Sequence, residues 1–532
     1  RHAFTAFVRI RTGMDAARAE EFSQQILLPV MPAIRMADVD ELGKRLEGLV
    51  AGNERELVRA AHAYAAEEAL RITDRRTYQA MEAFVHNLNT MNSRAGAQVP
   101  FSSVNYGTDT SAEGRMVVRN LLLATQAGLG SGETSIFPVQ IFKVKEGVNY
   151  NEGDPNYDLF KMAIKTSAMR LFPNFSFLDA PFNLQYYKPG DYNSEVAYMG
   201  CRTRVLGNVY DPDRQVTCGR GNLSFTSINL PRLGIEARGD LDRFFQLLDD
   251  QIDLVFRQLL HRFDIQCSKK VRNYPFLMGN GIWLDSEKLD WDDSVAEVLR
   301  HGTLTVGFIG LAETLVALTG KHHGESEESQ KLGLRIVEHM RKRCDDEAAK
   351  THLNFTLIAT PAEGLSGRFV ALDRKKYGVI KGVTDREYYT NSFHVPVYFP
   401  IKAFRKSDGN LYRTKEEIES WKQKCPIKAF RKIELEAPYH SFTNAGHITY
   451  VELDGDTCKN LEAFETIIRF MHDKGVGYGS INHPLDRDPV CGYVGVINGQ
   501  CPRCGRKEGE AVSQETLKML RRKYPHMPRC CR

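Results

Sequence analysis

Residues 195–207 read EVAYMGCRTRVLG and place one cysteine, Cys201, between a glycine and an arginine. The residues before Cys201 are apolar and typical of a strand. No other cysteine occurs among the first 217 residues, which argues against a disulfide framework. A cysteine considered alone is more often a buried, inert thiol than a reactive one. The rest of the sequence must therefore decide between these two interpretations.

The overall composition is that of an ordinary soluble globular protein. Of the 532 residues, 42% are hydrophobic and 26% charged, and the formal net charge is +4. This charge is too small to indicate nucleic acid or a membrane surface as the main partner. No run approaches the roughly 18 apolar residues of a membrane helix, and no secretory signal is visible. Eleven cysteines, crowded toward the C-terminal end, favour metal or redox chemistry in a reducing cytoplasm.

The pattern of apolar residues divides the chain into three regions. Residues 1–73 repeat apolar positions at helical spacing and predict a helical N-terminal segment. Residues 74–480 mix strand and helix patterns, with buried strands expected at 135–145 and 353–360 and core helices at 294–320. Such alternation favours a large α/β sheet or barrel. Residues 481–532 form the third region.

One short sequence occurs twice. PIKAFRK stands at 400–406 and again at 426–432, with a polar, lysine-rich stretch between the copies. A repeat architecture would contain more copies, so we expect a surface insertion at about 401–426. Cys425, which lies in that insertion, is then incidental.

The C-terminal region carries a metal-binding pattern. Cys501 and Cys504 form a C-x-x-C knuckle followed by glycine, and Cys491 can supply a third thiolate. Zinc prefers four such ligands in a closed tetrahedral site when its role is structural. The position expected for the fourth cysteine holds Asp488. The fourth ligand is therefore Asp488 itself, Cys530 or Cys531.

Three other stretches resemble the loops that surround a ligand. Asn222 heads an expected strand, so its side chain can face a cavity, although a turn or cap role is the simpler explanation. Residues 354–369 read as a strand, then Thr-Pro-Ala-Glu-Gly, then a helix whose free N–H groups could hold phosphate. Asn444 and Gly446 form a turn close to another expected strand.

Taken together, these stretches resemble the anaerobic (class III) ribonucleoside-triphosphate reductases of the glycyl radical enzyme superfamily. The resemblance runs in order from about residue 74 to about 510. The stretches that carry it are NLNTMNSRAGAQVPFSS (87–103), YMGCRTRVLGNVYDP (198–212), GRGNLSFTSINLPR (219–232), GTLTVGFIGLAE (302–313), NFTLIATPAEGLSGRF (354–369), YTNSFHVPVY (389–398), SFTNAGHITYVELDGD (441–456) and GYGSINHPLDRDPVCGY…CPRCGR (477–506).

The resemblance implies a ten-stranded α/β barrel threaded by a finger loop, with Cys201 at its tip as the thiyl radical that abstracts the 3′ hydrogen of the ribose. Asn222 would then bind the ribose hydroxyls, and a stretch near 87–103 would build the dimer interface and effector site. The expected substrate-binding residues are Thr360, Ala362, Glu363, Gly364, Asn444 and Gly446, and the expected metal ligands are Cys491, Cys501 and Cys504.

The sequence departs from the family pattern at both ends. An early segment with a His-Ile-His-Asp-like motif and a strand, which in formate-using members carries a second cysteine, is not found, nor is an ATP-cone. The radical glycine usually lies in an Arg-Val-x-Gly-Tyr loop after the zinc cysteines, and no such loop follows here. The residues VCGYVG at 490–495 are similar to that loop and put Gly492 in the radical position, but Gly492 precedes the C-x-x-C knuckle. The expectation is therefore a fragment or a chain without a radical carrier of its own.

The resemblance implies anaerobic reduction of ribonucleoside triphosphates to 2′-deoxyribonucleoside triphosphates in the cytoplasm by a homodimer. It implies dNTP and ATP effectors, a radical-SAM iron–sulfur activating enzyme, and either formate or a thioredoxin- or glutaredoxin-type reductant. The alternatives are a non-catalytic nucleotide-binding relative and a glycyl radical lyase, although lyases often place two adjacent cysteines at the loop tip. A zinc-ribbon nucleic-acid module would explain only the last ~50 residues.

Overall fold

A computed structural model of the protein describes residues 1–27, 35–92, 99–130, 132–361, 363–396, 427–453 and 456–483. In the C-terminal region it describes residues 485–488, 491, 493–495, 497, 500, 501 and 503–507. The expected insertion at 401–426 and the residues Ala362, Gly492, Cys530 and Cys531 lie outside these ranges.

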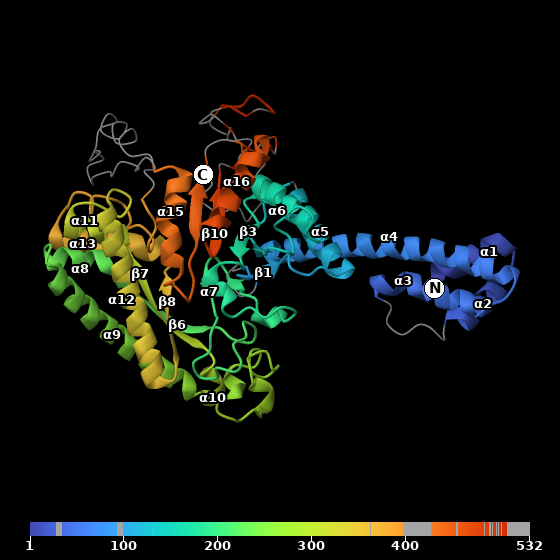
Figure 1. The fold of residues 1–532 in the computed structure, drawn as a ribbon, viewed down its shortest axis with the longest axis horizontal. Helices are drawn as coiled ribbons and strands as arrows, with labels where there is room; N and C mark the ends of the chain where they lie inside the picture. The colour runs from blue at the N-terminus through green and yellow to red at the C-terminus, as the bar shows by residue number, and fades with distance from the viewer. Residues whose placement is uncertain are drawn as a thin grey trace, which may run out of the picture.

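The N-terminal helices form an arm that stands away from the main body (Figure 1). The arm consists of α1 (His2–Thr12), α2 (Ala16–Leu27), α3 (Val39–Gly48) and the first part of α4 (Asn53–Thr90). These helices share a separate apolar core that includes Phe4, Leu46 and Val58. Helix α4 has 38 residues, which corresponds to a length of about 57 Å. It passes residue 73 without a break and packs against α5 (Ala112–Ala127) in the body.

The first sheet of the body has five strands in the order β1-β2-β3-β10-β9. Strands β1, β2 and β3 are parallel, β10 is antiparallel to β3, and β9 is parallel to β10. An apolar core lies between this sheet and the helices α6, α15 and α16. The bounds are β1 Ser103–Tyr106, β2 Val139–Val144, β3 Asn174–Phe177, β9 Thr449–Glu452, β10 Tyr478–Asn482, α6 Tyr157–Arg170, α15 Ala429–His440 and α16 Leu461–Asp473.

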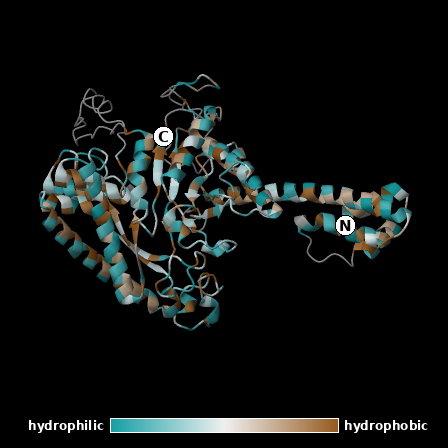
Figure 2. Ribbon diagram, viewed as in Figure 1, coloured by the Kyte–Doolittle hydropathy of each residue, from teal (hydrophilic) through white to brown (hydrophobic). Residues whose placement is uncertain are grey.

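The second sheet consists of the parallel strands β6, β7 and β8. One face of this sheet packs on amphipathic helices, which carry both apolar and polar residues (Figure 2). The bounds are β6 Asn222–Asn229, β7 Thr303–Ile309, β8 Asn354–Ala359, α8 Leu230–Ala237, α9 Leu241–Cys267, α11 Leu311–Thr319, α12 Glu327–Thr351 and α13 Glu363–Tyr377.

The expectation of core helices over residues 294–320 is wrong in its centre, because β7 occupies residues 303–309 between the short helix α10 (Ala296–Leu299) and α11. Alternate residues of β7 face opposite sides of the sheet. Leu304, Val306 and Phe308 enter the core with the helices, whereas Thr305 and Gly307 lie on the other side. The β-branched residues of this run favour a strand.

The two sheets meet along a seam, and residues 444–446 lie on it where the chain returns from the second sheet to the first. Residues 444–446 lie beside β8, because Ala445 N–H donates to Leu357 O and Ala359 N–H donates to Gly446 O. A few residues later the same segment becomes β9 of the first sheet. The expected barrel-type α/β fold is therefore present. The described residues place eight strands in these two sheets, and the remaining short strands form separate two-stranded pairs.

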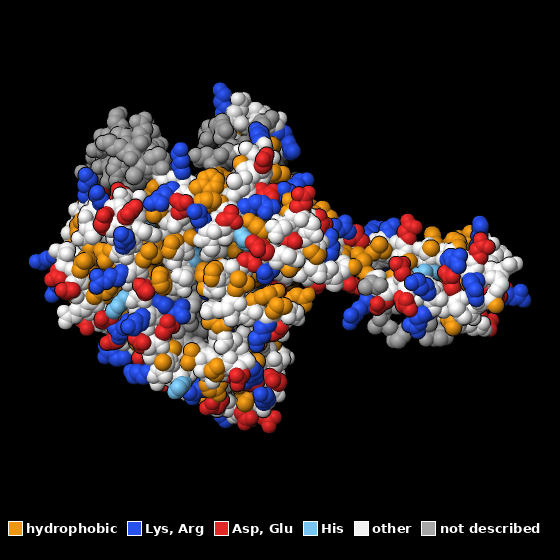
Figure 3. All heavy atoms as spheres, in the orientation of Figure 1, with side chains coloured by type: hydrophobic (Ala, Val, Ile, Leu, Met, Phe, Trp, Pro, Cys, Tyr) orange, Lys and Arg blue, Asp and Glu red, His pale blue; other side chains and the backbone are white. Residues whose placement is uncertain are grey.

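The visible surface in Figure 3 carries interspersed positive and negative side chains, with no extended patch of one sign. Among the helices of the described residues, none has both the length and the apolar character needed to cross a membrane.

Candidate functional site

Cys201 lies at the tip of a short hairpin. Strands β4 (Tyr198–Met199) and β5 (Thr203–Arg204) pair antiparallel, so that the three residues 200–202 form the turn. Gly200 takes a φ of 61° in this turn, a conformation that glycine adopts without strain. The Cys201 thiol is free and partly exposed. The sequence therefore places a single reduced sulfur at the end of a backbone projection, as the finger-loop expectation requires.

The base of this hairpin is held by buried aromatic residues. The Tyr198 ring stacks on Tyr478 with centroids 4.3 Å apart. The Tyr198 hydroxyl lies 3.0 Å from His447 Nε2, and burial raises the pKa of Tyr198 to about 12. This tyrosine therefore stays neutral and anchors the hairpin in the first sheet.

Asn222 begins β6 and points along a row of hydroxyl groups. Its side-chain amide donates to Thr303 Oγ1 at 3.0 Å and also to Thr305 Oγ1. Thr305 Oγ1 in turn lies 2.9 Å from Thr356 Oγ1 on the neighbouring strand. This face of the three-stranded sheet is therefore polar, in contrast to the apolar face packed on the helices, and it can offer hydrogen bonds to a sugar.

The expected phosphate-binding residues lie at the carboxyl end of β8. Thr360 is fully buried, and its Oγ1 is 2.8 Å from Ser227 Oγ at the end of β6. Gly364 lies in the first turn of α13, and a Cβ added there would meet open space. Glu363 begins that helix. Ligands of parallel sheets bind at this end of the strands, where helix N-termini also converge.

Arg202 is a functional candidate that the sequence reasoning missed. It is 1% exposed, and its Nη1 donates to the carbonyl oxygens of Ala359 and Thr360 at 3.4 Å each. Its guanidinium carbon lies 5.8 Å from the centre of the Tyr450 ring, and its Nε is buried without a hydrogen-bond partner. Arg202 thus connects the thiol hairpin with the carboxyl end of β8. Its position directly after Cys201 was the signal that could have identified it.

Asn444 and Gly446 hold the hairpin and β8 together. Asn444 Oδ1 accepts a hydrogen bond from Leu357 N–H, and the Asn444 carbonyl accepts one from Arg204 Nε. A Cβ on Gly446 would lie only 2.1 Å from the Arg202 carbonyl oxygen. These contacts place both residues beside the thiol hairpin, and they account for the glycine by the close approach of two backbones.

Behind the Tyr450 ring lies a buried group of charges. Lys432 Nζ contacts Glu436 Oε1 at 2.7 Å and donates to the Tyr450 carbonyl. His394 Nδ1 lies 3.3 Å from Glu436 Oε2. Burial opposes ionisation of Glu436, but Lys432 and His394 outweigh it and hold the pKa of that carboxyl well below its usual value. Glu436 is therefore charged, and the group gives this wall of the barrel a fixed ion pair.

The C-terminal cluster brings together Asp488, Cys491, Cys501 and Cys504, whose ligand atoms all lie within 4.8 Å of one another. Cys491 Sγ and Cys501 Sγ are 3.6 Å apart, too far for a disulfide. Thiolates at 2.3 Å from a tetrahedral zinc ion lie about 3.8 Å apart, so this spacing fits. Of the candidates for the fourth ligand, Asp488 is the one in the described residues. It is 2% exposed, and its Oδ2 is 3.1 Å from Arg506 Nε.

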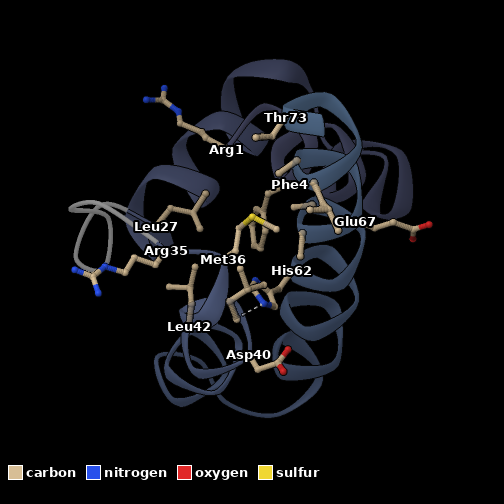
Figure 4. Close-up of a pocket in the computed structure, with 15 residues that line it drawn as sticks. Arg1, Phe4, Leu27, Arg35, Met36, Asp40, Leu42, His62, Glu67 and Thr73 are labelled. Carbon is tan, nitrogen blue, oxygen red and sulfur yellow. Dashed lines mark hydrogen bonds between the residues drawn. The ribbon is translucent and has the colours of Figure 1, made fainter. Parts of the chain in front are cut away.

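A separate cavity of about 570 Å³ lies in the arm, not in the barrel. Figure 4 shows Phe4, Met36 and His62 inside it, with Arg35 and Glu67 pointing outward. His62 Nε2 donates to the Val39 carbonyl. None of the expected site residues lines this cavity.

The chain matches known proteins over most of its length. The model of the family described as "Anaerobic ribonucleoside-triphosphate reductase" matches residues 33–410 and 420–521. The enzyme of that name from Salmonella typhimurium is 32% identical over 450 residues, which cover 83% of this chain and 58% of the relative. The one from Enterobacteria phage T4 is 31% identical over 453 residues, covering 83% of this chain and 67% of the relative. This chain thus spans little more than half the length of the Salmonella protein.

Solved structures share the fold. The anaerobic ribonucleotide reductase from Thermotoga maritima in complex with dATP and CTP superposes with a TM-score of 0.56 at 15% identity, covering 88% of this chain and 67% of that one. A B12-independent glycerol dehydratase from Clostridium butyricum gives a TM-score of 0.51 at 10% identity, covering 84% and 66%. With a family model that matches most of its length, the chain belongs to the anaerobic ribonucleoside-triphosphate reductase family.

Proposed function

We propose that this chain carries the catalytic barrel of an enzyme that reduces ribonucleoside triphosphates to 2′-deoxyribonucleoside triphosphates through a thiyl radical on Cys201. The observation that carries the proposal is a single free thiol on a hairpin that Arg202 joins to the end of β8. Family membership supports the reaction class. The Thermotoga relative, solved with dATP and CTP, supports nucleotides as ligands.

Cys201 is the residue that reacts with the substrate in this proposal. Its thiyl form takes the 3′ hydrogen atom of the ribose, forming an S–H bond. The 2′-hydroxyl then takes a proton and leaves as water, and two electrons and a proton enter from a reductant. The S–H bond finally returns its hydrogen atom to C3′, so the thiyl is regenerated. A glycyl radical would supply the oxidant that first removes the hydrogen atom from the thiol.

Other residues bind and orient the nucleotide. We assign the ribose hydroxyls to Asn222, supported by its place at the head of a row of hydroxyl groups. The phosphates are assigned to the backbone of residues 360–364, including Ala362 and Glu363, supported by the open space beside Gly364. Arg202 adds a positive charge beside this end of β8. A site with buried partners for both hydroxyls discriminates against sugars that lack them.

The remaining partners follow from the family. The proposal includes a cytoplasmic homodimer, dNTP or ATP effectors, a radical-SAM iron–sulfur activating enzyme, and formate or a thioredoxin- or glutaredoxin-type protein as reductant. Free cysteines throughout the described residues are consistent with a reducing compartment.

We further propose that the C-terminal cluster holds one structural zinc ion, with Cys491, Cys501 and Cys504 as thiolate ligands and Asp488 as the fourth. Cys491 N–H donates to Asp488 Oδ1, and Cys501 N–H donates to the Arg506 carbonyl. These bonds fix the two knuckles that present the ligands. Four protein ligands leave no open position, as in structural zinc sites.

The test is Cys201→Ser in the natural full-length protein, assayed anaerobically with its activating enzyme. We expect a normal radical signal by electron paramagnetic resonance and no deoxynucleotide, because an alcohol O–H bond is too strong for the glycyl radical to break. Asn222→Ala should keep weak turnover, since one lost active-site hydrogen-bond donor costs about 10²–10³ in rate. Deoxynucleotide formation by Cys201→Ser would overturn the proposal. Nucleotide binding without any radical in the wild-type protein would favour a non-catalytic relative.

A further inference from the structure

One face of the segment leading into and along β1 contacts the thiol hairpin. Phe101, Ser103 and Asn105 are alternate residues, so in an extended chain they point to the same side. All three contact residues 198–200, directly before Cys201. The resemblance places Phe101 and Ser103 at the end of the stretch expected to build the dimer interface and effector site, but it gives none of the three residues a role toward the thiol hairpin.

Asn105 binds the hairpin backbone at two points. Its Nδ2 donates to the Tyr198 carbonyl at 2.8 Å, and its Oδ1 accepts from Tyr198 N–H at 2.9 Å. An amide side chain thus replaces the pair of backbone hydrogen bonds that a neighbouring strand would make. Only an amide can both donate and accept here, so an aspartate of the same shape could not.

Ser103 and Phe101 fix the turn itself. Ser103 Oγ accepts a hydrogen bond from Gly200 N–H at 3.1 Å. The Phe101 ring lies so close to Gly200 that an added Cβ would be 2.7 Å from its Cε1. Gly200 is the residue next to the reacting thiol, so these two contacts set the direction in which the turn projects.

Phe101 is in turn placed by helix α4. Its ring meets Phe137 edge-on, with centroids 5.1 Å apart. Near the end of α4, Asn89 Oδ1 accepts hydrogen bonds from Ile136 N–H and Phe137 N–H, and Asn89 Nδ2 donates to the Phe137 carbonyl. A continuous set of contacts therefore runs from α4 through Phe137 and Phe101 to the thiol hairpin.

We infer that Phe101, Ser103 and Asn105 are positioning residues for Cys201, and that the end of α4 determines where Phe101 lies. This inference rests on the proposed role of Cys201 as the reacting thiol. Hydrogen abstraction requires the sulfur close to one particular C–H bond, and a misplacement of about 1 Å can cost about 10²-fold in rate. Contacts that fix the hairpin therefore bear on catalysis through the position of Cys201.

The experiment measures the hairpin directly, without requiring activity. Hydrogen–deuterium exchange of residues 195–207 and the alkylation rate of Cys201, both followed by mass spectrometry, are compared among Ser103→Ala, Asn105→Ala and wild type. Loss of one hydrogen bond should speed exchange at Gly200 about fivefold in Ser103→Ala, and the two bonds lost in Asn105→Ala should speed exchange at Tyr198 more. Cys201 alkylation should rise similarly relative to the exposed Cys218.

Matched variants separate positioning from general loosening. Ser103→Thr keeps the hydroxyl and should restore the wild-type rates. Ser102→Ala removes a hydroxyl that contacts Pro100 and not the hairpin, so it should change nothing. In the radical-loaded enzyme, Ser103→Ala should lower kcat while the KM for the nucleotide stays constant.

Unchanged exchange and alkylation in a folded Ser103→Ala protein would overturn the inference, and that variant suffices if Asn105→Ala does not fold. The same result in Ser103→Thr as in Ser103→Ala would also overturn it. Faster exchange together with unchanged kcat would overturn the inference too, because the contacts would then hold the hairpin without bearing on catalysis. The proposed function is tested separately, by deoxynucleotide formation in Cys201→Ser.

Discussion

Gly446 lies where the backbones of the thiol hairpin and β8 approach most closely. It has a φ of 141°, and a Cβ there would meet Arg202 O at 2.1 Å and Thr203 Cα at 2.8 Å. Real side chains do not tolerate such distances to backbone atoms. Gly446→Ala should therefore lower the free energy of unfolding by more than about 2 kcal/mol, measured by urea denaturation.

Gly475→Ala is the matched control. Gly475 also has a positive φ, 73°, but an added Cβ there would meet nothing within 4 Å. Its substitution should cost about 1 kcal/mol, from backbone strain alone. Equal losses for both substitutions would mean that the seam accommodates a side chain at position 446.

Asp488 gives a second prediction for a single residue. If its carboxylate is the fourth zinc ligand, Asp488→Ala should weaken zinc binding by about 10- to 100-fold, whereas Asp488→Cys should bind zinc at least as tightly as wild type. Competition with a chromophoric chelator measures both. Cobalt(II) in place of zinc should show stronger sulfur-to-metal absorption in Asp488→Cys, because a fourth thiolate joins the site. Unchanged affinity in Asp488→Ala would make Asp488 only a neighbour of the ligands.

Among the secondary-structure elements, the α15–β9 region carries buried neutral histidines. Gly477 N–H donates to His440 Nδ1, so His440 Nε2 carries the proton and donates to Thr449 Oγ1. Burial lowers the pKa of His440 to about 3, and it does the same for His323, which lies between α11 and α12 and packs against Tyr439 of α15. Both rings are therefore neutral in the folded protein at physiological pH.

These histidines should make the fold sensitive to acid. Since their folded pKa lies below the usual 6.5, the unfolded chain binds protons first, and stability falls as the pH drops below 6.5. At pH 5.5 each should cost about 1.4 kcal/mol relative to pH 7.5. Burial lowers the pKa of His472, but hydrogen bonds with Asp179 and Asp473 outweigh it and raise that pKa above its usual value. Protonation of His472 therefore stabilises the fold at low pH and offsets part of the stability lost through the neutral histidines.

Urea denaturation at pH 7.5 and 5.5 checks the prediction, and His440→Gln should reduce the difference in unfolding free energy between the two pH values by about 1.4 kcal/mol, its own share. This pH window lies above the ordinary titration of carboxylates, so it isolates histidines. A stability that does not change between the two pH values would contradict the neutral assignment.

The sequence predicted those elements whose pattern is local. The strands expected at 135–145 and 353–360 correspond to β2 and β8, and Asn222 indeed begins β6. The prediction of helices over residues 294–320 was wrong because a fully buried strand shows no alternation of apolar and polar residues. Periodicity alone could not separate β7 from the helices that flank it.

The site was predictable in part. Cys201, Thr360 and Gly446 lie together around the end of β8, as the motifs led us to expect. Arg202 and Asn105 were missed because their importance depends on contacts with residues distant in sequence, such as Tyr198, which follows Asn105 by 93 residues. No local pattern records such contacts.

Considered as a whole, the molecule has an arm whose core is separate from the cores of the body (Figure 1). Phe4 is 1% exposed within that core. Phe4→Ala should lower the free energy of unfolding of the arm by about 3–5 kcal/mol. The helices destabilised should be α1, α2 and α3. Hydrogen exchange should accelerate there and stay unchanged in β6, β7 and β8. Parallel acceleration in both parts would show that arm and body unfold as one unit.

The pairing of β3 with β10 joins residues 175 and 479, with nearly the whole barrel between them in the sequence. During synthesis on a ribosome, β1, β2 and β3 emerge long before their last partner exists. At about 5–20 residues per second, roughly 15–60 seconds separate β3 from β10. Throughout that time the β3 edge and the apolar surface that α16 later covers face the surrounding solution. Closure of the barrel therefore waits until β10 has been synthesised, and until then the open edge of β3 is available for pairing with other chains.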